Sequence, residues 1–413
     1  MGAVILMVAA SPLVFVFAHR GAAPLALALG AAVACRPSVW RAGVPKFLTR
    51  PLLVDPLVRA GLFFLAFCIW IAMTALWSPS SSAWKLALNA GAPVLAAGAI
   101  AWEIARRSDA ELEPLKRVAE GSLVAATVLL LFEALSGGLL RDLVPPADQS
   151  LNRVKDMIAL GRGVTALTTV LFAGLALIHR RGRSLWLSAA LFAATYLAAS
   201  RLQISANEGA LVGAAFVFFA ALRWPRAGVI ALSFATLFAL AAVPLAAALP
   251  VGELLTSAPD GAPISWLQRL VIWKTAGAEA LQCLPWGCGA EYARDLSARA
   301  GEAMIPGASL PLPVLPIHPH NLFIEIWLEL GIPGVVLFGG ALICAADALL
   351  AARLSRLALA AVLATAASAL VASLVETSLW QIWRHGAIVI AALFIALALR
   401  SGERVSPAPP SAP

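Results

Sequence analysis

Two of the five histidines, His318 and His320, stand two positions apart with Pro319 between them. An imidazole has a pKa near neutrality, so it can take a proton from a hydroxyl group as a general base. Pro319 restricts the backbone between the two rings, and Asn321 belongs to a residue type that caps helix N-termini with its side chain. The motif therefore predicts a general base, His320, held at the start of a helix.

Two other interpretations of these histidines remain open. A single histidine is more often structural than catalytic, and one near a membrane surface needs no function. A His-x-His pair could also bind a metal ion, but the sequence offers no clear third ligand apart from Glu325. A general base is the favoured interpretation, and no metal site is predicted.

Arginines form a second group of candidate residues. A guanidinium group suits bidentate contacts with phosphate oxygens, so Arg269, one helical turn before Trp273, is a candidate anion ligand. Trp and Arg are also enriched at membrane interfaces, where an arginine can extend to lipid phosphates, so an anchoring role competes. The other candidate ligands for the same anion are Arg153, Arg162, Arg201 and Arg384.

The segment after His320 carries two acidic residues in an apolar run, Glu325 and Glu329. They lie one turn apart on one helix face, where a carboxylate in a membrane is costly unless it is paired. A structural pair satisfied by arginine is slightly favoured over a contact between Glu325 and a substrate. Gly331 and Gly334 are expected to allow a close approach of helices.

Apolar helices make up the rest of the chain. Its 413 residues are 61 % hydrophobic and only 13 % charged, whereas about a quarter of a soluble protein is charged. Continuous apolar runs of about 17–25 residues predict an all-α polytopic membrane protein with about 12 transmembrane helices. A transmembrane β-barrel is disfavoured, because its strands would alternate apolar and polar residues. The expected spans are 3–18, 22–35, 57–77, 84–103, 118–140, 158–178, 184–200, 208–222, 227–248, 320–346, 357–376 and 385–400.

Lysines and arginines gather in alternate connections, which by the positive-inside rule predicts both termini in the cytoplasm and the histidines on the outer face. The net charge of +8 does not indicate a nucleic-acid partner, because the basic residues are spread between spans rather than gathered in one patch. The expected parts are an N-terminal bundle of about nine helices (1–248), a large periplasmic loop (249–319), C-terminal transmembrane helices (320–400) and a disordered cytoplasmic tail (401–413).

The large loop is too long for a simple connection, which is typical of a lid or a binding segment. A helix is expected over 265–281, with Trp266 and Trp273 on one face, as in a helix that lies at a membrane surface. Cys283 and Cys288 flank a Pro-Trp-Gly turn and could form a disulfide on an oxidising side, but unbridged thiols are favoured because a sequence does not supply the geometry.

A family resemblance emerges from these motifs in combination. The His-Asn pair at 320–321, followed after nine residues by Gly331-x-x-Gly334, resembles the motif of the O-antigen ligase and polymerase family. The number of spans and the late, long outer loop also agree with that family. The resemblance covers roughly 265–335 and is strengthened by Arg269-x-x-x-Trp273 and Gly287-x-Gly289.

The resemblance implies a metal-independent, inverting membrane glycosyltransferase of the bacterial inner membrane that needs no cofactor. Its donor would be a glycan on undecaprenyl pyrophosphate and its acceptor a lipid or glycan, with the lipid A core of lipopolysaccharide favoured. By this analogy His320 deprotonates the acceptor hydroxyl and Arg269 neutralises the departing pyrophosphate. His318 would support His320 or orient substrate, and the other expected substrate contacts are Asn321, Trp273, Arg153, Arg162, Arg201 and Glu325.

The family motif does not distinguish among acceptors. A surface-polysaccharide polymerase is the next alternative and a protein O-oligosaccharyltransferase the third, while a transporter of the same lipid-linked glycan is the rival from another class. One departure concerns the Ser-Arg pair that the family carries at the outer end of a middle span. Ser200-Arg201 could be this pair, but Ser205 at the start of the next helix fits as well and lacks the arginine.

Overall fold

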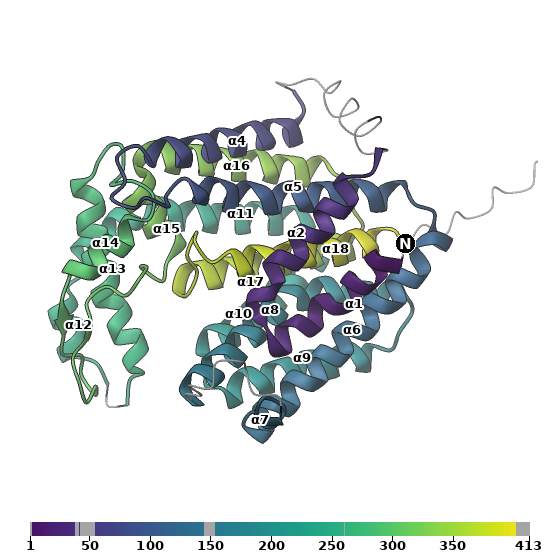
Figure 1. The fold of residues 1–413 in the computed structure, drawn as a ribbon, viewed down its shortest axis with the longest axis horizontal. Coiled ribbons are helices and arrows are strands. Elements are labelled where there is room, and N and C mark those ends of the chain that lie inside the picture. The colour runs from purple at the N-terminus through teal and green to yellow at the C-terminus, as the bar shows by residue number, and fades with distance from the viewer. Residues whose placement is uncertain (1, 38–40, 42–53, 144–152, 260, 402–413) are drawn as a thin grey trace, which may run out of the picture.

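The computed structural model describes residues 2–37, 41, 54–143, 153–259 and 261–401. Most of the long helices run along the long axis of the molecule (Figure 1). In these ranges the only strands are β1 (Glu302–Ala303) and β2 (Leu312–Pro313), a short antiparallel pair. The expected tail from 402 onward lies outside the described residues.

Each predicted span coincides with a helix. Among the described residues, eight helices are long and apolar enough to cross a membrane, and Val4–Phe17 and Pro225–Ala241 are shorter apolar helices. The prediction of an all-α polytopic membrane protein is therefore confirmed. The helices at the predicted spans are α1 (Gly2–Phe17), α2 (Ala22–Ala34), α4 (Pro56–Thr74), α5 (Lys85–Arg106), α6 (Asp109–Ser136), α8 (Arg153–Arg180), α9 (Leu185–Arg201), α10 (Ser205–Arg223), α11 (Pro225–Ala241), the interrupted helix α15–η4–α16 (Leu322–Ala351), α17 (Arg356–Val375) and α18 (Ile382–Leu399).

Helix boundaries differ from the predicted spans where polar residues cap or extend a helix. The span expected to begin at 118 begins at Asp109, because the Ser108 side chain and Glu111 form a capping box. The charged first turns of α6 therefore continue the apolar helix. The same helix ends at Gly137, whose φ of 69° is the left-handed conformation typical of a helix C-terminus.

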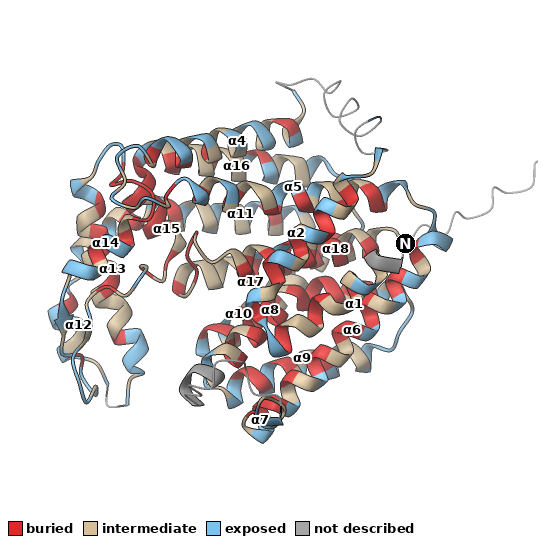
Figure 2. Ribbon diagram, viewed as in Figure 1, coloured by how far each residue is buried: buried red, intermediate tan, exposed pale blue. Residues whose placement is uncertain are grey.

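The interior is divided into two main hydrophobic cores. The bundle core lies among α1, α2, α5, α6, α8 and α18, and includes the fully buried Leu123, Leu167 and Phe394. The loop core contains Phe67 of α4, Ile272 of the large loop and Phe323 after the histidines. Buried residues follow the inner faces of the elements in both regions (Figure 2). Because the large loop contributes to a hydrophobic core, it is a packed part of the fold.

The large loop lies at one end of the molecule, on the left in Figure 1. The short helix η3 (Val243–Ala248) leads into it, and it contains α12 (Val251–Thr256), α13 (Ile264–Gln282), α14 (Tyr292–Arg299) and the two strands. The helix predicted over 265–281 is confirmed as α13. The segment then returns to the bundle through the two histidines, and the interrupted helix begins at Leu322.

Candidate functional site

The helix after His320 is interrupted, and the large loop fills the break. It consists of α15 (Leu322–Glu325), the π-helical turn η4 (Ile326–Leu330) and α16 (Gly331–Ala351). A π turn and Pro333, which has no N–H, leave backbone groups without partners inside the helix. The loop supplies these partners through Cys288 N–H to Leu328 O (2.8 Å), Gly289 N–H to Glu329 O (3.0 Å) and Ile332 N–H to Pro285 O (2.9 Å).

Glycines are required where the two backbones meet. Gly287 has a φ of 82°, and a Cβ there would lie 2.5 Å from Glu329 O; Gly331 has a φ of 62°, and a Cβ there would lie 2.3 Å from Pro285 O. Both contacts are too short for any side chain, and both φ values favour glycine. Gly331 therefore allows the backbone of the large loop, rather than another helix, to lie against the helix break.

The other two motif glycines have different neighbours. A Cβ on Gly289 would lie 2.8 Å from the Cα of Ser78, in the α4–α5 connection. A Cβ on Gly334 would lie 2.3 Å from the Leu330 Cβ of its own helix. The close helix approach that the sequence suggested occurs instead at Gly340, where a Cβ would lie 2.6 Å from the ring of Phe63 in α4.

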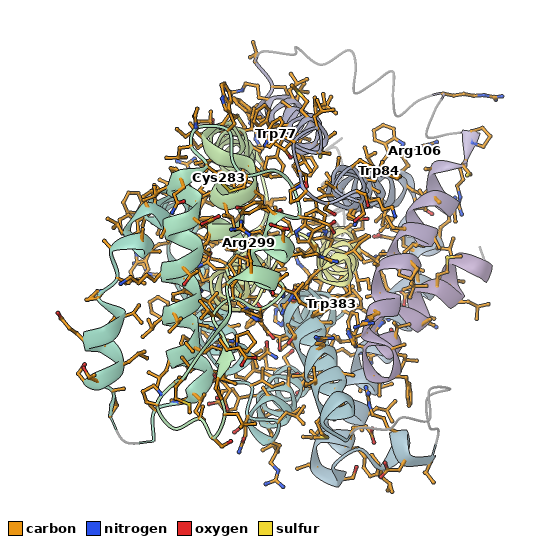
Figure 3. The ribbon with its side chains drawn as sticks, turned by 60° about the vertical axis from the view of Figure 1, so that its left-hand side comes forward. Trp77, Trp84, Arg106, Cys283, Arg299 and Trp383 are labelled. Carbon is orange, nitrogen blue, oxygen red and sulfur yellow. A yellow bond between two sulfur atoms is a disulfide. The ribbon has the colours of Figure 1, made fainter. Side chains whose placement is uncertain are left out.

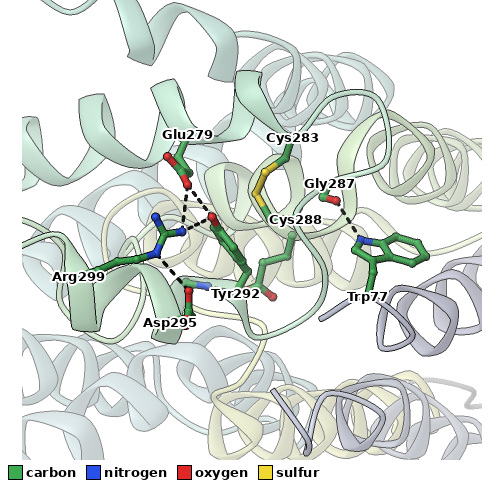
Figure 4. Close-up of a disulfide and its surroundings, with 10 residues drawn as sticks. Trp77, Glu279, Cys283, Gly287, Cys288, Tyr292, Asp295 and Arg299 are labelled. Atoms are coloured by element: carbon green, nitrogen blue, oxygen red, sulfur yellow. Dashed lines mark hydrogen bonds and ion pairs between the residues drawn. A yellow bond between two sulfur atoms is a disulfide. The ribbon is translucent and has the colours of Figure 1, made fainter. Parts of the chain in front are cut away.

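A disulfide between Cys283 and Cys288 closes the turn (Figure 4). The favoured expectation of free thiols is thus wrong, because the tight turn after α13 brings the two Cα atoms to 5.1 Å, within the range for a disulfide. The Trp77 indole donates to Gly287 O at 3.0 Å on one side of the turn. On the other side the hydroxyl of Tyr292 donates to Glu279 at 2.6 Å.

Glu329 ties α14 to the helix break. Its side chain is fully buried, and it accepts hydrogen bonds from Glu291 N–H at 2.9 Å and Ala293 N–H at 3.2 Å. The first N–H groups of a helix have no partner within the helix, so a carboxylate placed there supplies the missing acceptors. Its partners are backbone groups and not the arginine that the sequence suggested.

Glu325 is also fully buried and has a similar role toward the α17–α18 connection, residues 376–381. It accepts hydrogen bonds from the Ser378 hydroxyl at 2.7 Å and from Leu379 N–H at 2.6 Å. Both oxygens are therefore committed to a neighbouring segment. This geometry gives Glu325 a positioning role, and it does not make Glu325 a third ligand beside the two histidines.

The two histidines form a compact unit at the start of α15. Their ring centroids are 4.3 Å apart, and His320 N–H donates to His318 Nδ1 at 3.2 Å. The Asn321 side chain accepts from Phe323 N–H (2.9 Å) and Ile324 N–H (3.2 Å), which confirms the predicted cap. His320 has a φ of 54°, a left-handed conformation that is uncommon for a side chain of this size. Such conformations concentrate at functional sites.

The ring of His320 has one enclosed and one open nitrogen. Its Nδ1 is buried without a hydrogen-bond partner, whereas its Nε2 is not enclosed. Burial first and then the charge of Arg269 lower the pKa of His320 to about 4, against the opposing effect of Glu376. Burial and the neighbouring His320 and Arg384 lower the pKa of His318 to about 3. Both rings are therefore neutral at pH 7, as a base must be.

Arg269 approaches this unit from α13. Its Nε donates to Val375 O at 2.7 Å, one Nη donates to Ser265 O at 3.0 Å, and its guanidinium lies 5.4 Å from the centroid of the Trp266 ring. These contacts use only part of its five N–H donors. Burial lowers the pKa of Arg269, and Glu376 partly offsets this effect. Arg269 is therefore held in place with donors to spare.

Arg384 approaches from α18. It is 7 % exposed, donates from Nε to Gln381 Oε1 at 2.6 Å and lies 3.0 Å from the Glu376 carboxylate. Its guanidinium lies 4.6 Å from the centroid of the Trp383 ring. Figure 3, in which the loop end comes forward, labels Trp383 of α18 and also Cys283 and Arg299 of the large loop.

The remaining predicted contacts are placed at different distances from the histidines. Arg162, in α8, is close enough for its charge to lower the pKa of both His318 and His320. Trp273 is half-buried against the loop core, and its indole N–H is enclosed without a partner. Arg201 lies exposed at the end of α9. Arg153 is the first residue of α8, and its side chain lies outside the described residues.

Among the described residues, no group of three His, Cys, Asp or Glu side chains could hold a metal ion. Residues 168–339 match the family model described as O-antigen ligase. This segment is similar to the O-antigen ligase family. Members of this family are membrane glycosyltransferase-type enzymes that act on lipid-linked glycans. No curated protein matches the chain.

Residues outside the matched segment also belong to the candidate site. Arg162 precedes the segment, whereas Glu376, Gln381 and Arg384 follow it by several tens of residues. Glu376 and Gln381 belong to no recognisable sequence motif, and neither does the buried His19, whose ring packs edge-on against Trp383 at 5.3 Å. In the sequence, these residues are only polar residues in or near short connections that are expected on the outer face. Polar residues are common in solvated turns, so they did not indicate a site.

Proposed function

We propose that the protein transfers a glycan from undecaprenyl pyrophosphate to an acceptor hydroxyl, with the lipid A core as the favoured acceptor. One observation carries the proposal: His320 presents an open, neutral nitrogen beside Arg269, which has donors to spare. A donor with a pyrophosphate leaving group needs a base for the acceptor, positive charge for the leaving group and alignment of the two. His320 and Arg269, both within the matched segment 168–339, are suited to the first two tasks, and the packed loop supports the third.

The proposed reaction is a single displacement. His320 Nε2 takes the proton of the acceptor hydroxyl while that oxygen forms a bond to the anomeric carbon of the donor sugar. The bond between this carbon and the pyrophosphate oxygen breaks, the configuration inverts, and both electrons leave with the pyrophosphate. Arg269 stabilises the negative charge on the departing group. The imidazolium then loses its proton to solvent, and no metal ion takes part.

The donor itself would strengthen the base. A pKa of about 4 makes free His320 a weak base. A bound pyrophosphate places negative charge close to the ring, and an opposite charge within about 4–6 Å favours the protonated form. The pKa of His320 therefore rises toward neutrality when the donor binds. Proton abstraction then becomes effective only in the complex that can react.

The other predicted contacts support this arrangement in different ways. His318 holds the backbone of His320, and Asn321 and Glu325 fix the start of the helix and the α17–α18 connection. Arg162 adds positive charge, and the free indole N–H of Trp273 can bind a ligand oxygen. We assign Arg153 and Arg201 to more distant parts of the pyrophosphate or to lipid phosphate.

We place the site on the periplasmic face of the inner membrane, with both termini in the cytoplasm. The disulfide supports this orientation, because disulfides persist in oxidising compartments. The bias of lysine and arginine between alternate connections supports it independently. A reporter enzyme fused within 290–310 should be active in the periplasm, and one fused after Arg404 should not; the opposite pattern would overturn the orientation and the mechanism together.

The decisive experiment is glycan transfer by the purified protein from an undecaprenyl-pyrophosphate donor in the presence of EDTA. Lipid A core, a second lipid-linked glycan and an acceptor protein are supplied separately. Product on lipid A core supports the ligase, growth of the lipid-linked chain identifies a polymerase, and modified protein identifies an O-oligosaccharyltransferase. Loss of transfer with EDTA would refute metal independence, and donor movement across vesicles without transfer would identify a transporter.

A further inference from the structure

The α17–α18 connection holds a side chain that links the two histidines to Arg384. Gln381 Nε2 lies 3.2 Å from His318 Nε2, and Gln381 Oε1 accepts the Arg384 Nε–H at 2.6 Å. His318 Nδ1 in turn faces His320 N–H at 3.2 Å. We propose that Gln381 is a positioning residue, which holds the His318 ring and through it the backbone of the base, His320.

This inference rests on the proposed role of His320 and explains how its conformation is maintained. A left-handed φ of 54° is strained for histidine, so neighbouring contacts must hold it. The cap at Asn321 fixes the backbone after His320. The contact with His318 fixes the backbone N–H before it. Gln381 holds the other edge of the His318 ring, so its loss would release the contact between His318 and the His320 N–H.

The chain of contacts is anchored in a rigid part of the fold. Arg384 is buried, ion-paired with Glu376 and placed over the Trp383 ring. Glu325 holds Leu379 in the same connection. Because Arg384 remains charged, its Nε–H requires an acceptor, and this requirement orients the Gln381 amide with its oxygen toward Arg384 and its NH₂ toward His318.

Counting donors shows why this contact is sensitive to the residue at 381. A neutral imidazole accepts at one nitrogen and donates at the other. His318 instead faces N–H groups at both nitrogens, from Gln381 and from His320. The two donors therefore compete for one acceptor. A carboxylate at 381 would accept from both Arg384 and His318, which would leave His318 Nδ1 free to accept from His320.

The charged and titratable groups around the pair come from every neighbouring element. His318 is affected by His320, Arg384, Arg162 and Arg294, while His320 is affected by Arg269, Glu376, Arg384 and Arg162. Only Glu376 in this set is acidic. A second carboxylate beside His318 would therefore have a clear effect on the protonation of that ring, because an opposite charge within about 4–6 Å shifts a pKa by about 1–3 units.

The experiment compares Gln381→Leu and Gln381→Glu in the full-length purified protein. We expect Gln381→Leu to lower kcat for transfer about 10- to 100-fold with little change in KM for the donor. The substitution leaves His320 in place but removes a contact that holds it in position. Gln381→Glu should retain kcat, with the acidic limb of its pH profile moved upward by about one unit or more. Unchanged kcat in the leucine variant, or equal losses in both with unchanged pH profiles, would overturn the inference.

A measurement that does not need transfer separates this inference from the proposed function. The five histidines are labelled and titrated by NMR in micelles, with resonances assigned from single substitutions. Gln381→Glu should raise the pKa of His318, and Gln381→Leu should change its tautomer population. If wild-type protein shows no transfer but these shifts occur, only the proposed function fails; if transfer occurs and His318 does not respond, only the role of Gln381 fails.

Discussion

Two ends of the helical bundle use the same residue types for opposite purposes. At the paired end, where α5 passes into α6, the enclosed arginines Arg36, Arg107 and Arg181 meet carboxylates. At the site end, where the large loop meets the histidines, positive groups outnumber acids around the two rings. Figure 1 places α13 and α14 at the opposite end of the molecule from the α5–α6 junction. The comparison shows that an arginine indicates a ligand only where its neighbours leave its charge unbalanced.

The paired end is neutralised by short contacts. Glu103 pairs with Arg36 and with Arg107, the latter at 2.6 Å. Arg181 contacts Glu113 at 2.9 Å and Glu120 at 2.7 Å. Arginine and acidic side chains that are largely enclosed must be paired, because removing one partner leaves a costly buried charge. These residues thus stabilise the fold.

The site end carries a surplus of donors. Arg269 and Arg384 share one carboxylate, that of Glu376, and both histidines are half-buried and neutral. Burial alone would raise the pKa of Glu376, but the charges of Arg384 and Arg269 lower it, so it remains ionised. A polyanionic ligand would complete the charge balance that protein groups complete at the paired end.

The largest expected effect comes from removing the base. His320→Ala should reduce glycan transfer by about 10²- to 10⁴-fold, because general-base catalysis contributes about this much. Membrane insertion should be unaffected. His179→Ala provides the control, since this histidine is exposed in the last turn of α8. Rates measured on purified protein check the prediction, and a fully active His320→Ala variant would remove His320 from the reaction.

A matched pair of arginine substitutions tests the comparison itself. Arg269→Ala should lower kcat about 10²- to 10³-fold with little loss of stability, because it removes charge stabilisation from the transition state. Arg181→Ala should instead destabilise the fold by about 1–3 kcal/mol, because it removes charged hydrogen bonds from Glu113 and Glu120, which keep Arg117 and Arg183 as partners. Transfer rates and thermal melting should thus separate the two variants; the same phenotype in both would contradict the distinction.

Docking of the loop on the helix break should depend on Gly287. Gly287→Ala should lower stability by a few kcal/mol, since a Cβ would overlap Glu329 O and φ is 82°. Gly301→Ala is the control, because φ there is 73° but no atom lies within 4 Å of the added Cβ. We expect the control to lose about 1 kcal/mol of folding stability. Equal melting temperatures for the two variants would show that the close contact is unimportant.

The smallest effect is a pH dependence of stability. Folding lowers the pKa of His318 to about 3 and that of His320 to about 4, from about 6.5 when unfolded. The unfolded chain therefore binds more protons between these values, and stability falls as pH falls from about 6.5 to about 4. We expect a loss of a few kcal/mol of folding stability over this range. Thermal melting should show a weaker pH dependence in His320→Ala.

The sequence alone predicted much of this molecule because the relevant signals are local. Apolar runs specified the helices at every predicted span, and Asn321 was recognised as the cap of the helix after the histidines. The spacing of His320 and Gly331 predicted the family whose domain occupies 168–339. Helix length, capping and motif spacing depend on residues close together in the chain, so no tertiary information was needed.

Only the tertiary structure decided which distant residues share the site. Glu376, Gln381 and Arg384 come to the histidines because α17 and α18 pack against the elements that precede them, and a sequence does not encode such contacts locally. The same applies to Glu329, whose partners are loop N–H groups in place of an arginine. Whether a charged residue is paired with an opposite charge depends on distances across the fold. The sequence therefore predicted His320 as the base, but only the structure distinguished the arginines that are paired with carboxylates from those with excess positive charge.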